Sequence, residues 1–268
     1  MKKTYSTKGV AISLLKVVLY FALYLAIQIA VTNIIYGILI LKFPSFDSYQ
    51  LTEIMESLSL EINIIGCIST VAALALIAKL NKSSLSHAAE IKKYQGGFTL
   101  TLLIMGVASA YAIMLVFGLL EEAGIFPESW IKAQSSAYQN VYSAGPFMRF
   151  ISVCVVAPIM EEVLFRGFIL GSLKKEMHPW IAVAVSAVVF AVAHGTPIGI
   201  MYTLLLGLLM GWLTVTFKSI IPSVLLHMAY NGTVAYSGGV SLGIAVLSLP
   251  ILAFEIYSIK NYFRGKKE

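Results

Sequence analysis

The sequence predicts an all-α protein that crosses a lipid bilayer repeatedly. Hydrophobic residues make up 59% of the 268 residues and charged residues only 12%, and the mean hydropathy is +0.86. A soluble domain carries about 25% charged and about 45–50% apolar residues. Because each spanning helix needs about 20 apolar residues, helices and short loops account for the chain and leave no room for a large soluble domain.

Eight apolar segments separated by turn and charge signals set the expected number of spanning helices at eight. The breaks contain proline, glycine, lysine or asparagine, which favour turns and helix ends. The segments cover residues 10–41, 56–80, 98–120, 147–173, 178–195, 198–217, 219–236 and 239–259.

The distribution of basic residues supports this number. Basic residues gather in the cytoplasmic loops of membrane proteins, and an even number of spans with both termini in the cytoplasm collects most of them on one face. The net charge of +6 therefore arises from basic residues at one membrane face and does not indicate binding to nucleic acid. We expect a multi-pass protein of the cell membrane whose partner is the lipid bilayer. The residues on that face are Lys2, Lys3, Lys8, Lys79, Lys82, Lys92, Lys93, Lys174, Lys175, Lys218, Lys260, Arg264, Lys266 and Lys267.

The chain divides into four parts. Residues 1–120 hold three spanning helices, and residues 121–146, the longest polar stretch, form an extracytoplasmic loop or an interfacial helix around residues 129–142. Residues 147–260 form a second helical region, and residues 261–268 form a basic cytoplasmic tail. Cys67 and Cys154 both lie in apolar segments, so we expect no disulfide framework.

Two adjacent carboxylates, Glu161 and Glu162, lie within the fourth apolar segment. An acidic side chain at the bilayer centre costs roughly 2.5–3.5 kcal/mol on insertion scales. Arg166 follows Glu162 by four residues, the spacing of a helical ion pair. Neighbouring residues on a helix point about 100° apart, so we expect Glu162 to pair with Arg166 and Glu161 to have a different role.

Three further polar residues lie deep in later apolar segments: His194, His227 and Asn231. Measured from the cytoplasmic helix ends at about 1.5 Å per residue, Glu161 and Asn231 lie roughly 18 Å deep, His227 about 12 Å and His194 about 24 Å. The sequence therefore predicts that all four side chains border one cavity near the middle of the membrane.

These residue types suit the activation of water. A carboxylate accepts a proton from water, and imidazoles orient that water or bind a metal. Two histidines with one carboxylate are also a zinc ligand set, and if a metal is present we expect Glu161, His194 and His227 to hold it. Taken singly, each group also has a structural interpretation, as a packed histidine or a buried ion pair.

In order, Glu161-Glu162-xxx-Arg166, Phe190-xxx-His194 and His227-xxx-Asn231 resemble the three motifs of the CAAX protease and bacteriocin-processing family, also called the abortive-infection family. The resemblance covers about residues 145–235 and implies an intramembrane endopeptidase whose catalytic core is the region 147–260. It implies that Glu161 and His194 activate water, that His227 and Asn231 form the oxyanion site, and that Glu162 and Arg166 support them. It leaves open a metal-free glutamate mechanism, which needs no cofactor, or a zinc enzyme.

Two other functions remain open at this point. Some relatives in this family are thought to be non-catalytic, so an immunity protein or a scaffold for a membrane partner such as a sensor kinase is the alternative to a protease. A proton-coupled transporter using Glu161 and Glu162 as a relay is the third hypothesis. For a protease we expect a membrane-associated peptide or protein as substrate, and peptide precursors rather than prenylated proteins.

Overall fold

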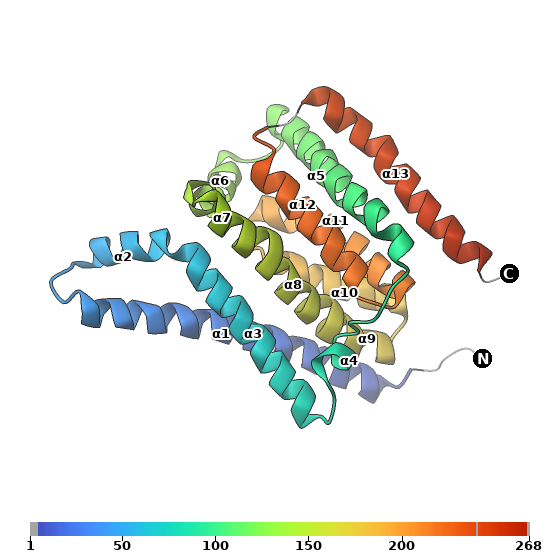
Figure 1. The fold of residues 1–268 in the computed structure, drawn as a ribbon, viewed down its shortest axis with the longest axis horizontal. Coiled ribbons are helices and arrows are strands. Elements are labelled where there is room, and N and C mark those ends of the chain that lie inside the picture. Colours follow the sequence, from blue (N-terminus) through green and yellow to red (C-terminus); the bar gives the residue numbers. More distant parts are fainter. Residues whose placement is uncertain (1–4, 240, 267–268) are drawn as a thin grey trace.

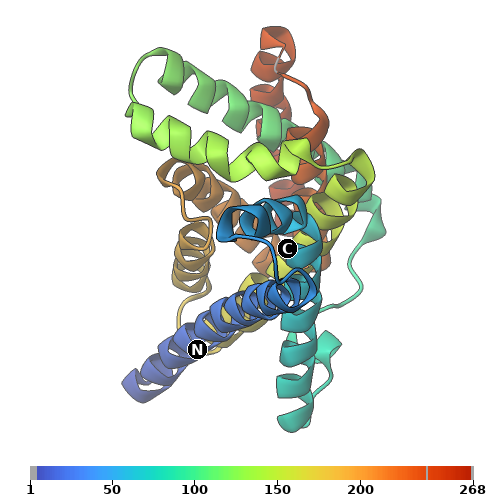
Figure 2. The same cartoon turned by 90° about the vertical axis from the view of Figure 1, so that its left-hand side faces the viewer.

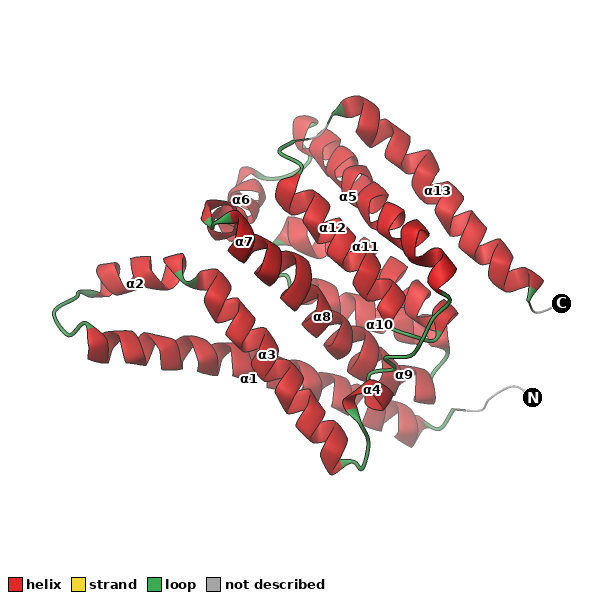
Figure 3. Cartoon of the chain, viewed as in Figure 1, coloured by secondary structure: helices red, strands yellow, loops and turns green. Residues whose placement is uncertain are grey.

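The computed structural model describes residues 5–239 and 241–266, apart from the side chain of Asn140. Within these ranges the chain forms helices and loops and no strand (Figure 3), which confirms the expected all-α class. Lys2, Lys3 and Lys267 of the basic face lie outside the described residues. The N-terminal helices are α1 (Thr7–Lys42), α2 (Ser48–Ser57), α3 (Ser59–Leu80), α4 (Leu85–Ala88), η1 (Gly96–Phe98), α5 (Thr99–Glu122) and α6 (Glu128–Ser143).

The C-terminal half consists of one long helical run followed by four separate helices. The run contains α7 (Pro146–Arg149), η2 (Phe150–Val156), α8 (Ala157–Glu161), η3 (Glu162–Leu170) and α9 (Gly171–Glu176). The separate helices are α10 (Pro179–Val192), α11 (Pro197–Phe217), α12 (Ile221–Tyr236) and α13 (Leu242–Gly265).

Each of the eight apolar segments contains a helix, and the protein is a membrane protein. Five helices, α1, α3, α5 with η1, α11 and α13, are long and apolar enough to cross a bilayer, and α10 is a shorter apolar helix. The first turn of α1 and the last turn of α13 lie at the same side of the molecule (Figure 1), as an even number of crossings requires. The number of eight crossings and the cytoplasmic position of the termini stay predictions.

Prolines and caps explain why the last helices follow one another so closely. Pro179, Pro197 and Pro222 each occupy the first turn of a helix, where the missing N–H is not needed. The Thr196 hydroxyl accepts a hydrogen bond from the Gly199 amide at 3.0 Å and caps α11. At the other end of α11, Lys218 adopts the left-handed conformation, with φ of 53°, so each break needs only a few residues.

The run from Pro146 to Glu176 is not a regular α-helix. The segments η2 and η3 are π-helical and flank the short α8, which carries Pro158 in its first turn. A proline within a helical run favours a kink, and the structure has wider, π-helical turns on both sides of Pro158. A π-turn changes which side chains share a face, and such turns are frequent at functional sites.

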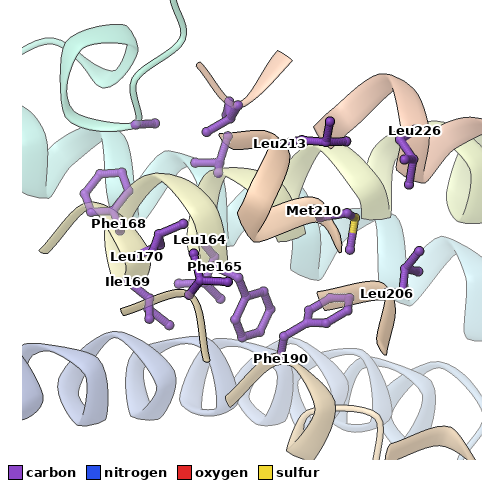
Figure 4. Packing of buried hydrophobic residues seen from close by; sticks show 14 of the residues in the cluster. Leu164, Phe165, Phe168, Ile169, Leu170, Phe190, Leu206, Met210, Leu213 and Leu226 are labelled. Carbon is purple, nitrogen blue, oxygen red and sulfur yellow. The ribbon is translucent and has the colours of Figure 1, made fainter. Parts of the chain in front are cut away.

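The helices of the C-terminal half pack around one apolar core. There η3, α10, α11 and α12 surround side chains that include Phe165, Phe190 and Met210 (Figure 4). A Cβ atom at Gly207 of α11 would lie 3.1 Å from the Cβ of Ala187 of α10, so small residues let these two helices approach closely. The hairpin of α1, α2 and α3 projects from one side of this bundle (Figure 1).

The polar stretch 121–146 contains a helix, which decides between the two structures that the sequence left open. Helix α6 runs across one end of the bundle, over the helices α10 and α11 (Figure 2), and contacts α11 and α3. None of its described residues is fully buried, so α6 is held at the bundle surface rather than within the core.

The contact between α5 and α12 depends on a glycine. A Cβ atom at Gly106 would lie 2.4 Å from the carbonyl oxygen of Leu226 and 2.7 Å from the Cβ of Ala229. Because backbone atoms cannot move aside cheaply, we expect Gly106→Ala to lower the free energy of unfolding by about 1–3 kcal/mol. Gly118→Ala in the same helix is the control, since no atom lies within 4 Å of its Cβ position. Thermal unfolding in detergent measures both, and equal midpoints would contradict this packing.

Candidate active site

The polar residues found in the sequence surround one cavity between α8, α10, α11 and α12. The cavity has a volume of about 210 Å³, and Glu161, His194, His227 and Asn231 all line it. Glu161 is the last residue of α8, His194 lies in the turn after α10, and His227 and Asn231 belong to α12. The fold thus brings together side chains that the sequence places up to 70 residues apart. Phe190 forms part of the wall, and Phe165 packs on Phe190 with ring centroids 5.2 Å apart.

The two adjacent glutamates have different environments, as the helix geometry predicts. Glu161 lines the cavity with 20% of its side chain exposed, whereas the side chain of Glu162 is 0% exposed. The difference in side-chain exposure implies different roles, because of the two glutamates only Glu161 is accessible to a substrate or to water in the cavity.

Glu162 lies between two partners on opposite sides. Its Oε2 is 3.3 Å from Nε of Arg166, which is also fully buried, and its Oε1 is 3.0 Å from Nδ1 of His227. The Arg166 guanidinium stacks 4.3 Å above the ring of Phe190, an additional cation–π contact. The expected pair of Glu162 with Arg166 is present, and Glu162 also fixes the orientation of His227.

His227 contacts both glutamates. Because the carboxylate of Glu162 accepts, Nδ1 of His227 carries the proton of that bond, and Nε2 points to Oε2 of Glu161 at 3.6 Å. His227 therefore lies between the fully buried carboxylate and the carboxylate that lines the cavity.

His194 has a defined tautomer as well. Its Nδ1 lies 2.9 Å from the carbonyl oxygen of Phe190. Because a carbonyl oxygen only accepts, this nitrogen carries the hydrogen, and in the neutral ring Nε2 keeps its lone pair. The sequence pairs Glu161 with His194; within the described residues no hydrogen bond or ion pair joins these two side chains, and the ion pair of Glu161 is with His227.

Asn231 is oriented by the helix η2. Its Nδ2 donates a hydrogen bond to the carbonyl oxygen of Val153 at 2.9 Å. An amide NH2 group has two hydrogens, so the second hydrogen and the side-chain oxygen remain for groups in the cavity that Asn231 lines.

The geometry does not fit a bound metal ion. Over the described ranges, no three side chains of the types His, Cys, Asp and Glu come together in a way that would hold one. We therefore derive no step through zinc from Glu161, His194 and His227.

Helix α6 closes one side of the cavity with two tyrosines. Tyr138 and Tyr142 line the cavity, and the hydroxyl of Tyr138 is hydrogen-bonded to that of Tyr202 on α11. A second bond runs from the Thr196 hydroxyl to Oε1 of Gln134. Nothing in the sequence distinguishes these tyrosines from others, so their position could be found only in the structure.

Arg149 fixes the end of α6. Its guanidinium donates to the carbonyl oxygens of Val141, Tyr142, Ala144 and Ala235 at 2.6–3.2 Å. Arg149 thereby joins the end of α6 to α12.

Comparisons with known proteins find relatives of the region that carries this site. Residues 143–233, which include all six polar residues, match the family model described as type II CAAX prenyl endopeptidase Rce1-like. A protein of Bacillus subtilis (strain 168) named "Putative membrane peptidase YdiL" is 27% identical over 135 residues, which is 50% of this chain and 51% of that protein. The match thus spans about half the length of this relative. No solved structure matches the chain at a significant level.

The buried pair of Glu162 and Arg166 gives a test by stability. Removing one partner of a buried ion pair leaves the other charge uncompensated and costs about 3–5 kcal/mol. We expect Glu162→Gln to destabilise the protein by an amount of this order, and Glu162→Gln with Arg166→Met to recover most of it. Thermal unfolding in detergent measures both variants. A double variant no more stable than the single one would show that the two charges are not coupled.

Proposed function

We propose that this chain, which belongs to the CAAX protease family through its residues 143–233, is an intramembrane endopeptidase. It cleaves a peptide bond in a membrane-associated peptide or protein. The observation that carries the proposal is the position of Glu161 in a cavity, beside a histidine whose orientation is fixed by a second, fully buried carboxylate. A buried acid that orients a histidine is the arrangement of many hydrolases.

In the proposed reaction Glu161 acts as the general base. Ionised Glu161 takes a proton from water while the water oxygen attacks the peptide carbonyl carbon, and His194 orients this water through the lone pair on Nε2. The charged His227, donating through Nε2, and the free amide hydrogen of Asn231 stabilise the oxyanion. Glu161 then returns the proton to the leaving nitrogen as the C–N bond breaks. This glutamate mechanism uses no metal.

The cavity must enlarge to admit a peptide. Its volume of about 210 Å³ is below the range of about 300–1,000 Å³ that is typical of ligand pockets. The part of α6 before Val141 is the wall suited to move, because none of its described residues is buried and it is tied to α11 by hydrogen bonds of Gln134 and Tyr138. The end of α6 stays attached through Arg149. We therefore assign substrate entry to a displacement of α6.

Replacement of Glu161 tests its role as the general base. We expect Glu161→Gln to lower peptide cleavage by at least about 100-fold, as for the loss of a general base, while the protein keeps its fold. Peptides isolated from cells that produce the wild type or the variant provide the measurement, and reconstituted protein then cleaves the peptides so identified. Glu255→Gln on α13, outside the cavity, is the control. We expect cells with this variant to yield the same peptides as cells with the wild type.

An unchanged peptide set with Glu161→Gln would contradict the catalytic assignment. If a cellular phenotype also survives His194→Ala and His227→Ala, the chain acts as a binding or signalling protein of the same family instead of a protease.

The hydrogen bond between Tyr138 of α6 and Tyr202 of α11 must break when α6 moves. We expect Tyr138→Phe, which removes the bond to Tyr202, to raise kcat/KM by up to about fivefold, since one net hydrogen bond of about 1 kcal/mol then no longer opposes opening. Tyr142→Phe is the matched control: Tyr142 lies on the same helix and lines the same cavity, but its hydroxyl makes no hydrogen bond to the residues described. Equal kinetics for the two variants would show that this bond does not limit entry.

A further inference from the structure

A second hollow lies on the far side of η3, away from the cavity with Glu161. It has a volume of about 560 Å³ and lies between α1, the end of α3, the short α4 and the turn from η3 to α9. This volume is within the range of ligand pockets. None of the residues proposed for peptide cleavage lines it, so its purpose is separate from that reaction.

The charge of this hollow is positive. Lys16, Lys92 and Lys175 line it, and the one acidic side chain there, Glu90, forms an ion pair with Lys174. In the part of the chain that the structure describes, Lys16 and Lys92 form no ion pair with any carboxylate. The hollow therefore offers two unmatched ammonium groups to an anion.

Lys16 has an unusual position for a lysine. It lies nine residues after the start of α1 at Thr7, which is about 14 Å along the helix at 1.5 Å per residue. Its neighbours Leu14, Leu15, Val17 and Val18 are apolar. A charged side chain within an apolar stretch of a spanning helix needs a polar or anionic partner, and an anion in the hollow provides one.

Glycines on the helical run shape the floor of the hollow. A Cβ atom at Gly167 would lie 2.8 Å from Ala89, so the segment after α4 packs directly on η3 there. One turn further on, a Cβ atom at Gly171 would meet only the carbonyl oxygen of Arg166 at 4.0 Å. Gly171 therefore faces open space, and hydroxyl groups of Ser83 and Ser172 line the same hollow.

The outer face of α1 identifies the kind of anion. Leu15, Val18 and Leu19 flank Lys16 and are 57%, 62% and 57% exposed. Only 11% of the most apolar stretch of α1 is buried within the protein. A ligand with a phosphate in the hollow and hydrocarbon chains along this apolar face satisfies both features.

We propose that the hollow binds the headgroup of an anionic phospholipid. Lys16 and Lys92 contact the phosphate, the polar side chains of Ser83 and Ser172 line the site around it, and the acyl chains lie along α1. Basic pockets between membrane helices on the basic face of a protein bind such headgroups, and a charge-assisted hydrogen bond from lysine to phosphate is strong. A lipid here holds α1 against η3, the helix that carries Glu162 and Arg166.

The test is native mass spectrometry of the purified protein in detergent, with phosphatidylglycerol or phosphatidylcholine added. We expect the wild type to retain phosphatidylglycerol selectively. The double variant Lys16→Gln with Lys92→Gln should lower this retention at least about tenfold. The control Lys79→Gln with Lys93→Gln removes the same charge from exposed lysines outside the hollow and should retain the lipid.

A third variant tests the site without changing charge. Gly171→Leu places a side chain in the open space of the hollow and should also abolish retention, with thermal unfolding confirming the fold of each variant. Equal loss in the two lysine double variants, or no selectivity for phosphatidylglycerol, would overturn the proposal.

Competition with inorganic phosphate distinguishes a lipid headgroup from a soluble anion. If millimolar phosphate displaces the lipid or binds without it, the ligand is a soluble anion and the lipid assignment is wrong. None of these measurements involves peptide cleavage, so their outcome is independent of the proposed protease activity.

Discussion

The interaction on which the site depends is the contact of Glu162 with Arg166 and His227 in a fully buried position. Glu162 and Arg166 have no exposed side-chain surface, and charges in such an environment persist only when they are paired. The pairing fixes the plane of the His227 ring, because one oxygen of Glu162 faces Arg166 and the other faces Nδ1 of His227. The second imidazole nitrogen is thereby directed towards Glu161.

The two glutamates occupy adjacent positions of one helical run, where successive side chains point about 100° apart in an α-helix. Glu161 is the last residue of α8, and Glu162 begins η3. Glu161 therefore faces the cavity while Glu162 faces the interior. The same helical run then continues to Gly171, where it forms the floor of the basic hollow. One run of helix thus links the proposed reaction site with the proposed lipid site.

The membrane setting explains which parts of the site the sequence predicts. Charged and polar groups are rare at depth in a bilayer, so Glu161, His194 and Asn231 stand out, and the spacing of Glu162 and Arg166 predicts their pair. The contact of His227 with both glutamates depends on the π-turns and on how α12 packs against α8, which residue spacing does not encode.

Other features lack a sequence signal for different reasons. Tyr138 and Tyr202 are two tyrosines among 14, and only the course of α6 across the bundle brings them together. The eight apolar segments predict the helices well, but the four-residue α4 and the division of the run from Pro146 depend on tertiary packing. Lys16 is visible in the sequence as a charge within an apolar helix, yet its relation to Lys92 requires the fold.

The central claim is that buried Glu162 holds His227 with a hydrogen on Nδ1 and so directs Nε2 towards Glu161. Nitrogen-15 NMR of protein labelled at its four histidines tests this directly, with the signal of His227 assigned by its loss in His227→Gln. We expect Nδ1 of His227 to be protonated in the wild type and its resonance to shift in Glu162→Gln. An unprotonated Nδ1, or a spectrum of His227 that does not change when Glu162 is replaced, would contradict the account.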